Sequence, residues 1–274
     1  MKISCPAKLN IGLKINSKRP DGYHDLETEF RLISLYDYLE IKESKTFQLN
    51  INNDEIETED NLITKAYFLM KSLCHEKSDF SFKVQKNIPI GAGLGGGSSN
   101  CASTLIVLNK LFKLNLPDSK LLKIGLSLGS DVPFFIKGEN SIAKGRGELL
   151  ETIEIEANYY LIIYPDIKIS TADAFKFYEE NKTDFPKHLK NDFEYFARKV
   201  YPEINEIFNL MSQYGTVELS GTGSSMYLNF NSSEEAYTIA TKVPTNCKFF
   251  VTRSLDKSPI CLLYTSDAAD ETGR

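Results

Sequence analysis

The sequence predicts an α+β fold, and three observations support this prediction. Segments with alternating apolar residues come in a run at the start of the chain, as expected for strands. One segment with apolar residues at helical spacing follows, before another strand, a glycine-rich loop and a second helix. The chain has 274 residues, 42% of them hydrophobic and 25% charged, which is enough for one large domain or two of ordinary size.

The first strand is predicted over residues 1–16, where apolar and polar residues alternate loosely. Lys8 and Asn10 lie two residues apart, so in a strand their side chains project from the same face. An exposed polar face on an edge strand is the alternative interpretation. Further strands in this part of the chain are predicted at 28–34, 37–43, 47–51 and 80–86.

Helices are predicted where apolar residues recur at helical spacing. The first covers 61–73 and follows an acidic run whose last member, Asp60, can cap it. Two more are predicted at 98–112 and 117–128. An apolar strand is predicted at 132–136, which places Asp131 between a helix end and a buried strand. A carboxylate there needs a partner or a chemical role, with turn formation or capping as the alternative.

The rest of the chain adds a second set of strands and helices. A strand at 159–164 ends at Pro165, a candidate domain boundary, and Ser170 begins a helical segment as its N-cap. The remaining predicted elements are helices at 193–199, 204–214 and 234–242 and strands at 216–219, 226–230, 248–253 and 260–264. Residues 265–274 are small and acidic without apolar pattern, which predicts a disordered or non-native tail.

Composition and charge exclude several classes of protein. The net charge of −5 does not favour a general nucleic-acid-binding surface, and no apolar run approaches the ~20 residues of a membrane span. We therefore expect neither nucleic acid nor membrane as a partner. The five cysteines are odd in number and widely spaced, which predicts thiols in a reducing, cytoplasmic compartment. The three histidines and these cysteines show no metal-ligand spacing, so we expect no protein-built metal centre.

The most informative stretch is a glycine loop in which five of the seven residues at 91–97 are glycine. Glycine permits positive φ and lets a ligand approach the backbone without meeting a Cβ. Because the loop leads into a helix, it directs several N–H groups and the positive end of the helix dipole at one place, which suits a phosphate. A flexible linker is the alternative interpretation.

Three common nucleotide motifs do not fit this loop. A Walker A motif needs Gly-Lys-[Ser/Thr], and here Gly96 is followed by Gly97 and Ser98. The pattern Gly91-x-Gly93-x-x-Gly96 matches the dinucleotide fingerprint formally, but the required second strand with its acidic residue does not follow. The protein-kinase alternative lacks both His-Arg-Asp and Asp-Phe-Gly.

Two other turn-rich elements complete the set of candidate functional segments. In the turn Arg19-Pro20-Asp21-Gly22-Tyr23-His24, the last two residues can stack on and hydrogen-bond a planar ring. A Tyr packed over the turn and a solvent-facing His are the alternative. The segment Ser220-Gly221-Thr222-Gly223-Ser224-Ser225 is either a simple hairpin turn or a second loop that closes on the same phosphorylated ligand.

Three motifs together resemble those of the GHMP small-molecule kinases. Pro89-x-x-x-Gly93-Leu94-Gly95-Gly96-Gly97-Ser98-Ser99 resembles their central ATP-binding motif. Pro6-Ala7-Lys8-Leu9-Asn10 is similar to their first motif and Gly221-Thr222-Gly223-Ser224-Ser225 to their third. The Arg19–His24 turn and Leu128-Gly129-Ser130-Asp131-Val132-Pro133-Phe134-Phe135 further resemble the members that act on a cytidine diphosphate conjugate of methylerythritol.

The resemblance implies an architecture and a reaction. It implies an N-terminal ATP-binding domain of β-α-β-β type at 1–157 and a C-terminal α/β sandwich domain with an antiparallel sheet at 158–264. The implied reaction transfers the γ-phosphoryl group of ATP, with Mg²⁺, to a hydroxyl of the methylerythritol part of that conjugate. We expect a monomer or weak homodimer. The alternatives are a homoserine-type or mevalonate-type kinase of the same superfamily, and a non-catalytic nucleotide-binding module.

The resemblance also assigns site residues. Asp131 matches the catalytic base and Lys8 its charged partner. Residues assigned to ATP are Pro89, Gly91, Gly93, Leu94, Gly95, Gly96, Gly97, Ser98 and Ser99, with Asn61, Leu62 and Lys86 on the adenine side. Residues assigned to the acceptor are Asn10 for its hydroxyls, Tyr23 and Phe175 to sandwich cytosine, His24 for the cytosine edge, Thr171 nearby, and Gly221, Thr222 and Gly223.

Overall fold

The computed structural model describes residues 1–74, 78–181, 185–186 and 188–261. The predicted tail at 265–274 and the last part of the predicted strand at 260–264 lie outside the described residues. Within the described residues, no helix is both long and apolar enough to cross a lipid bilayer.

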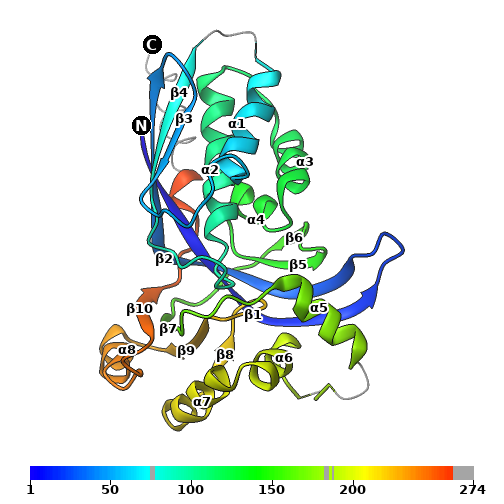
Figure 1. Ribbon diagram of the computed structural model, residues 1–274, viewed down its shortest axis with the longest axis vertical. Coiled ribbons are helices and arrows are strands. Elements are labelled where there is room, and N and C mark those ends of the chain that lie inside the picture. The colour runs from blue at the N-terminus through cyan, green and yellow to red at the C-terminus, as the bar shows by residue number, and fades with distance from the viewer. Residues whose placement is uncertain (75–77, 182–184, 187, 262–274) are drawn as a thin grey trace.

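The first sheet is organised around two long antiparallel strands, β1 (Lys2–Lys18) and β2 (His24–Ser44). The edge of β2 opposite β1 pairs with β4 along one part of its length and with β5 along another. β3 then pairs with β4, and β6 with β5, so the order is β3-β4-β2-β5-β6. They are β3 (Gln48–Ile51), β4 (Asp79–Gln85), β5 (Ser141–Gly145) and β6 (Leu149–Thr152). The β1–β2 ribbon crosses the molecule from the N-terminal end and projects beyond the sheet at its tip (Figure 1).

Four helices pack on one face of this sheet (Figure 1). They are α1 (Leu62–Ser72), α2 (Gly96–Leu111), α3 (Asp118–Leu128) and α4 (Val132–Lys137). The packing follows from their apolar sides: Tyr67 and Leu105 from the helices share a buried core with Leu39 and Phe82 from the strands. Helix α2 is buried along most of its length, so its N-terminus is held firmly in place.

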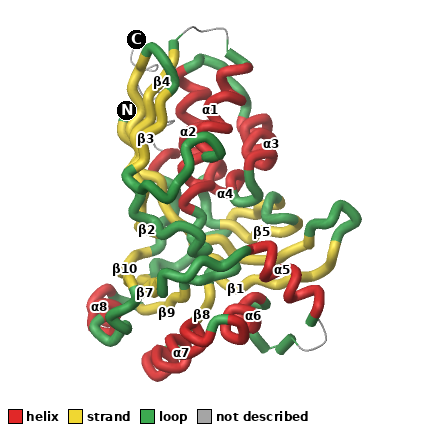
Figure 2. The backbone as a smooth tube through the Cα atoms, viewed as in Figure 1, coloured by secondary structure: helices red, strands yellow, loops and turns green. Residues whose placement is uncertain are grey.

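The second sheet is antiparallel, with the order β10-β7-β9-β8. Its strands are β7 (Tyr159–Tyr164), β8 (Glu218–Leu219), β9 (Met226–Phe230) and β10 (Lys248–Arg253). Four helices accompany it (Figure 2): α5 (Thr171–Glu180), α6 (Phe193–Val200), α7 (Pro202–Met211) and α8 (Ser233–Ala240). Short 3-10 turns lie at Ser212–Tyr214 and Pro259–Cys261. The predicted α+β fold class is confirmed.

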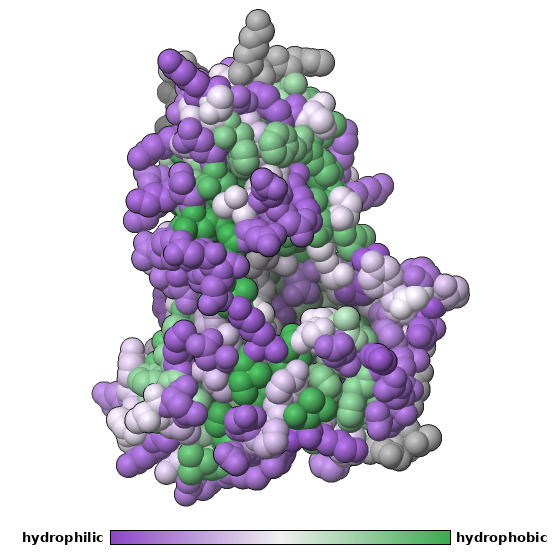
Figure 3. Space-filling model, viewed as in Figure 1, coloured by the Kyte–Doolittle hydropathy of each residue, from purple (hydrophilic) through white to green (hydrophobic). Residues whose placement is uncertain are grey.

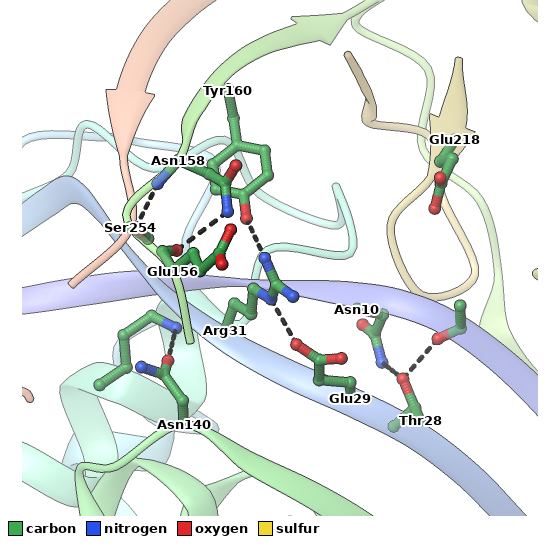
Figure 4. A network of polar contacts seen from close by, with 12 residues as sticks. Asn10, Thr28, Glu29, Arg31, Asn140, Glu156, Asn158, Tyr160, Glu218 and Ser254 are labelled. Carbon is green, nitrogen blue, oxygen red and sulfur yellow. Dashed lines mark hydrogen bonds and ion pairs between the residues drawn. The ribbon is translucent and has the colours of Figure 1, made fainter. Parts of the chain in front are cut away.

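The two sheets are joined through the β1–β2 ribbon. Leu9 and Ile33 of the ribbon share a buried cluster with Ile162 and Tyr227 of the second sheet. Arg31 on β2 donates to the Tyr160 hydroxyl on β7 at 2.8 Å, and it also pairs with Glu29 (Figure 4). Side chains that project from the ribbon at this joint therefore meet elements of both sheets.

The segment 132–136 is a helix, so the predicted strand there is wrong. Pro133 lies in the first turn of α4, where a missing N–H costs nothing, whereas a central strand needs that N–H for its ladder. Gly138, at φ +66°, then ends the helix. Asp131 consequently lies between two helices, at the N-cap of α4, rather than before a buried strand.

Other differences are local. The strands predicted at 28–34 and 37–43 form one strand, because β2 accommodates extra residues opposite Pro6 and Ala7 as a bulge instead of stopping. Asn61, not Asp60, caps α1, with its side chain accepting from the Ile63 N–H. Residues at the start of the predicted strand 260–264 belong to a 3-10 turn.

Candidate active site

Two cavities meet at the glycine loop, and Gly91, Gly93 and Gly95 line both of them. The first cavity, about 640 Å³, is also lined by side chains from β1, β2 and α5. The second cavity, about 500 Å³, lies between the loop, the start of α1 and the end of β4. The face of the molecule seen in Figure 3 is hollowed between its upper and lower parts, with polar and apolar side chains mixed around the hollow.

The loop backbone depends on glycine. Gly91, Gly93 and Gly95 have φ values of +64°, +74° and +72°, a region that other residues rarely adopt. Gly95 is the N-cap of α2 and provides no side-chain cap, so N–H groups of the first turn stay available to a ligand. Ser99 has a buried hydroxyl oxygen with no hydrogen-bond partner. A phosphate-binding loop fits this geometry, and α2 begins at Gly96, inside the predicted loop.

The second glycine-serine element packs directly against this loop. A Cβ on Gly93 would overlap the Ser220 carbonyl oxygen, and Ser220 Oγ donates to the Gly93 carbonyl at 3.0 Å. The Ser225 N–H donates to the Ala92 carbonyl at 3.2 Å. The element is thus a hairpin turn between β8 and β9 and also a support for the first loop. Gly221 and Thr222 line the first cavity, while Gly223 lines neither cavity and shapes the turn through its N–H to Ser220.

Lys8 and Asp131 form an ion pair in the first cavity. Lys8 Nζ lies 3.5 Å from Asp131 Oδ2, with the lysine side chain 5% exposed and the aspartate 33% exposed. Burial lowers the pKa of Lys8, and the carboxylate of Asp131 opposes that shift. Asn10 lies on the same face of β1 as predicted: its Oδ1 accepts from Lys8 and its Nδ2 donates to Thr28 Oγ1 at 3.0 Å (Figure 4).

The ribbon tip and α5 provide the aromatic end of the first cavity. The His24 ring stacks on Phe175 with centroids 4.7 Å apart, and its Nε2 lies 2.7 Å from Glu179 Oε1. Tyr23 is half exposed, and Arg146 lies over its ring with the guanidinium carbon 3.5 Å from the centroid. His24 is 8% exposed, so the alternative of a solvent-facing histidine is wrong. Thr171 reaches this cavity as well, 3.3 Å from the Thr222 hydroxyl.

The second cavity collects the residues assigned to the adenine side. Asn61, Leu62, Lys86 and Pro89 all line it, together with Gly96, Gly97 and Ser98. The Lys86 ammonium, however, points into the protein, where it pairs with the fully buried Asp37 and donates to Asn100 Oδ1 at 3.2 Å. Leu94 also lines this cavity, but it is only 1% exposed and packs in the core shared by the two sheets.

Two charged residues near the site were not predicted. Asp37 Oδ1 accepts from the backbone N–H groups of Asn87 and Ile88 at 2.8 and 2.9 Å, which fixes the segment leading to the glycine loop. Its partner is 49 residues away in the sequence, so no local pattern reveals the pair. Arg146 lies in a turn whose charged residues are visible in the sequence, but its place beside Tyr23 depends on the tertiary fold.

Within the described residues, no group of three or more His, Cys, Asp or Glu side chains is close enough to hold a metal ion. Oxygen donors at the start of α2 are instead the hydroxyls of Ser98 and Ser99, and that of Ser99 is buried and unpartnered.

Comparison with known proteins gives matches over nearly the whole chain. Family models of the GHMP kinases N terminal domain and the GHMP kinases C terminal region match residues 61–139 and 177–248. A 4-diphosphocytidyl-2-C-methyl-D-erythritol kinase of Acinetobacter baylyi is 37% identical over 278 residues, 97% of this chain and 99% of that protein. A protein of the same description from Pseudoalteromonas translucida is 38% identical over 93% of each chain.

Solved structures match in the same way. The crystal structure of a 4-(cytidine 5'-diphospho)-2C-methyl-D-erythritol kinase has a TM-score of 0.79 and 26% identity, covering 93% of this chain and 99% of that one. A mevalonate kinase has a TM-score of 0.69 at 17% identity over 94% of this chain and all of that one, a likeness that concerns the fold alone.

Proposed function

The chain belongs to the GHMP kinase family, and from that premise we propose that it phosphorylates 4-diphosphocytidyl-2-C-methyl-D-erythritol at its 2-hydroxyl group with ATP. The products are the 2-phosphate and ADP, in the non-mevalonate route to isoprenoid precursors. The match to kinases of this description over at least 93% of the chain supports this acceptor rather than homoserine or mevalonate. The single observation that carries the chemistry is the Lys8–Asp131 pair beside a glycine loop that lines two cavities.

Each cavity takes one substrate. ATP occupies the second cavity, with its adenine near Asn61 and Leu62 and its phosphates on the N–H groups of the loop and of the first turn of α2. The acceptor occupies the first cavity, which contains Asp131 and Lys8. Since the loop borders both cavities, the γ-phosphoryl group and the acceptor hydroxyl meet beside Gly93 and Gly95.

Asp131 is the base in this proposal. A bond forms between the acceptor oxygen and the γ-phosphorus while the bond from that phosphorus to the β,γ-bridging oxygen breaks, and ADP leaves with the electron pair. The hydroxyl proton passes to the carboxylate of Asp131, which is one-third exposed and faces the cavity. The ammonium of Lys8 offsets the negative charge that develops on the acceptor oxygen.

Mg²⁺ is proposed as the ion that accompanies ATP. The hydroxyl of Ser98, which lines the second cavity, would hold it together with the phosphates, since oxygen donors suit this ion. The hydroxyl of Ser99 also has no protein partner, but Ser99 lines neither cavity. When bound, the ion neutralises phosphate charge. We also place the reaction in the cytoplasm, on the ground that Cys5 and Cys101 are buried thiols.

The remaining acceptor residues have proposed roles in recognition. Asn10, adjacent to Lys8, orients the methylerythritol hydroxyls. Tyr23 and Phe175 supply aromatic surfaces for cytosine in the same cavity, and His24, which stacks on Phe175 and contacts Glu179, supplies the contact to the cytosine edge. Thr171 and Thr222 close the side of the cavity that faces α5.

A coupled assay of ADP release with three acceptors tests the proposed function. The cytidyl conjugate 4-diphosphocytidyl-2-C-methyl-D-erythritol, homoserine and mevalonate are each offered with ATP and Mg²⁺ at equal concentrations. We expect turnover with the cytidyl conjugate alone. Turnover with homoserine or mevalonate but not with the conjugate would contradict the proposed acceptor, and failure with all three would contradict the proposed reaction.

A further inference from the structure

The charged side chains of the first cavity are unequally compensated. Among the described residues that line it, the ionisable groups other than Tyr23 are Lys8, His24, Asp131 and Arg146. Lys8 pairs with Asp131 at 3.5 Å, and His24 contacts Glu179 at 2.7 Å. The guanidinium of Arg146 forms no ion pair with a carboxylate in the described part of the chain. The cavity therefore holds one cation whose charge is not matched by an acidic group.

The position of Arg146 is built by a tight turn. It lies between β5 and β6, flanked by Gly145 at φ +70° and Gly147 at φ +106°. The neighbouring carboxylate of Glu148 accepts the backbone N–H of Arg146 at 2.5 Å, so this acid fixes the turn rather than neutralising the guanidinium. The backbone of this turn therefore fixes the position from which the Arg146 side chain reaches the cavity.

The side chain is also oriented. Its guanidinium carbon lies 3.5 Å from the centroid of the Tyr23 ring, a cation–π contact that holds the charged group at this end of the cavity. Its Nε is buried and has no hydrogen-bond partner. A buried donor without a partner costs free energy unless a ligand accepts its hydrogen bond. The unpartnered donor and the uncompensated charge both indicate an anionic ligand in this cavity.

We propose that Arg146 binds the diphosphate group of the acceptor. The inference rests on the proposed function, which gives the acceptor of this cavity a diphosphate between cytidine and methylerythritol. Lys8 is committed to Asp131 and lies at the reacting end, whereas Arg146 lies beside Tyr23 at the aromatic end. The planar guanidinium presents paired N–H donors that match phosphate oxygens. Arg146 thereby distinguishes a diphosphate conjugate from an uncharged acceptor.

The test compares two inhibitors that differ only in the diphosphate. Inhibition constants for CDP and for cytidine, each competing with the cytidyl conjugate, are measured for the wild-type protein and for Arg146→Met. We expect Arg146→Met to raise the inhibition constant of CDP by about tenfold to a hundredfold and that of cytidine by less than about twofold. Arg146→Lys keeps the charge without the planar fork, and we expect it to recover part of the CDP affinity.

The matched control is Lys144→Met. Lys144 is in the same hairpin and carries the same charge, but its side chain is 55% exposed, pairs with Glu27 at 3.9 Å, and lines neither cavity. We expect this variant to bind CDP as the wild type does. The midpoint of thermal unfolding of each variant shows whether the fold is intact.

Each other result has a defined meaning. Equal loss of CDP and cytidine in Arg146→Met would show that Arg146 acts through Tyr23 and would overturn the diphosphate assignment. A rise in the KM for ATP with unchanged CDP affinity would overturn it in favour of the donor phosphates. If the wild type neither binds CDP nor turns over the conjugate, the proposed function itself fails, a result that is distinct from a failure confined to Arg146.

Discussion

Two lysine–aspartate pairs lie near the glycine loop, each with a buried lysine, and they differ in the exposure of the carboxylate. Asp37 is fully buried, and its oxygens accept hydrogen bonds from Lys86 and from two backbone N–H groups. Asp131 is 33% exposed, has Lys8 as its one ion-pair partner among the described residues, and faces a cavity. A fully buried carboxylate that already accepts three hydrogen bonds stabilises structure, whereas one with an accessible oxygen can accept a proton from a substrate. The contrast assigns the first pair to positioning and the second to chemistry.

The position of each lysine strengthens this contrast. The Lys86 ammonium lies beneath the start of α2, where a Cβ on Gly96 would come within 3.1 Å of it. That place is unfavourable for an uncompensated cation, because it adds to the positive end of the helix dipole. Asp37 offsets the charge and at the same time fixes residues 87 and 88 ahead of the loop. The Lys86–Asp37 pair therefore helps to fix the position of the glycine loop, and the Lys8–Asp131 pair lies next to that loop.

The largest effect is expected for Asp131→Asn. The amide cannot accept the acceptor's proton, so kcat should fall by about a hundredfold to ten-thousandfold. Steady-state kinetics with ATP and the cytidyl conjugate measure this, and CDP inhibition shows whether the acceptor side still binds. A kcat close to that of the wild type would show that Asp131 is not the base.

Asp37→Asn should lower the stability of the fold and leave kcat nearly unchanged. It leaves Lys86 buried without a countercharge, and breaking a buried pair in this way costs about 3–5 kcal/mol of unfolding free energy. Denaturant unfolding measures the loss, while kcat of the folded fraction should stay within a few-fold of the wild type. The double variant Asp37→Asn with Lys86→Met removes the uncompensated charge and should regain part of the stability. An intact unfolding free energy combined with a large loss of kcat would reverse the roles assigned to the two pairs.

The smallest effect concerns pH. Burial lowers the pKa of Lys8 below its ordinary value of 10.5, so the proton is lost at a lower pH than from an exposed lysine. Activity that needs the charged form is present below the pKa of Lys8 and declines as the pH rises through it. Lys8→Arg keeps a permanent charge, and its kcat–pH profile should lose this alkaline decline. An identical decline in both proteins would assign it to another group.

Sequence reasoning predicted the parts of the site that depend on short-range pattern. The common face of Lys8 and Asn10 follows from strand periodicity, and the loop at 91–97 follows from its glycines. The error at 132–136 was avoidable in principle, because Pro133 within an apolar run favours the first turn of a helix over a central strand. Asp37 and Arg146 could not be assigned, since their partners Lys86 and Tyr23 are distant in sequence. Such contacts are set by tertiary packing, which no local pattern records.

The β1–β2 ribbon has a consequence for how this protein can change. It carries Lys8 and Asn10 near its middle and Tyr23 and His24 at its tip, and it packs against both sheets. Because side chains alternate along a strand, inserting one residue between Lys8 and Asn10 would turn them to opposite faces, while two would restore the alternation. The ribbon's middle therefore resists changes of length. Insertions and deletions are more readily accommodated in the turn at its tip, where the chain contacts the aromatic end of the first cavity.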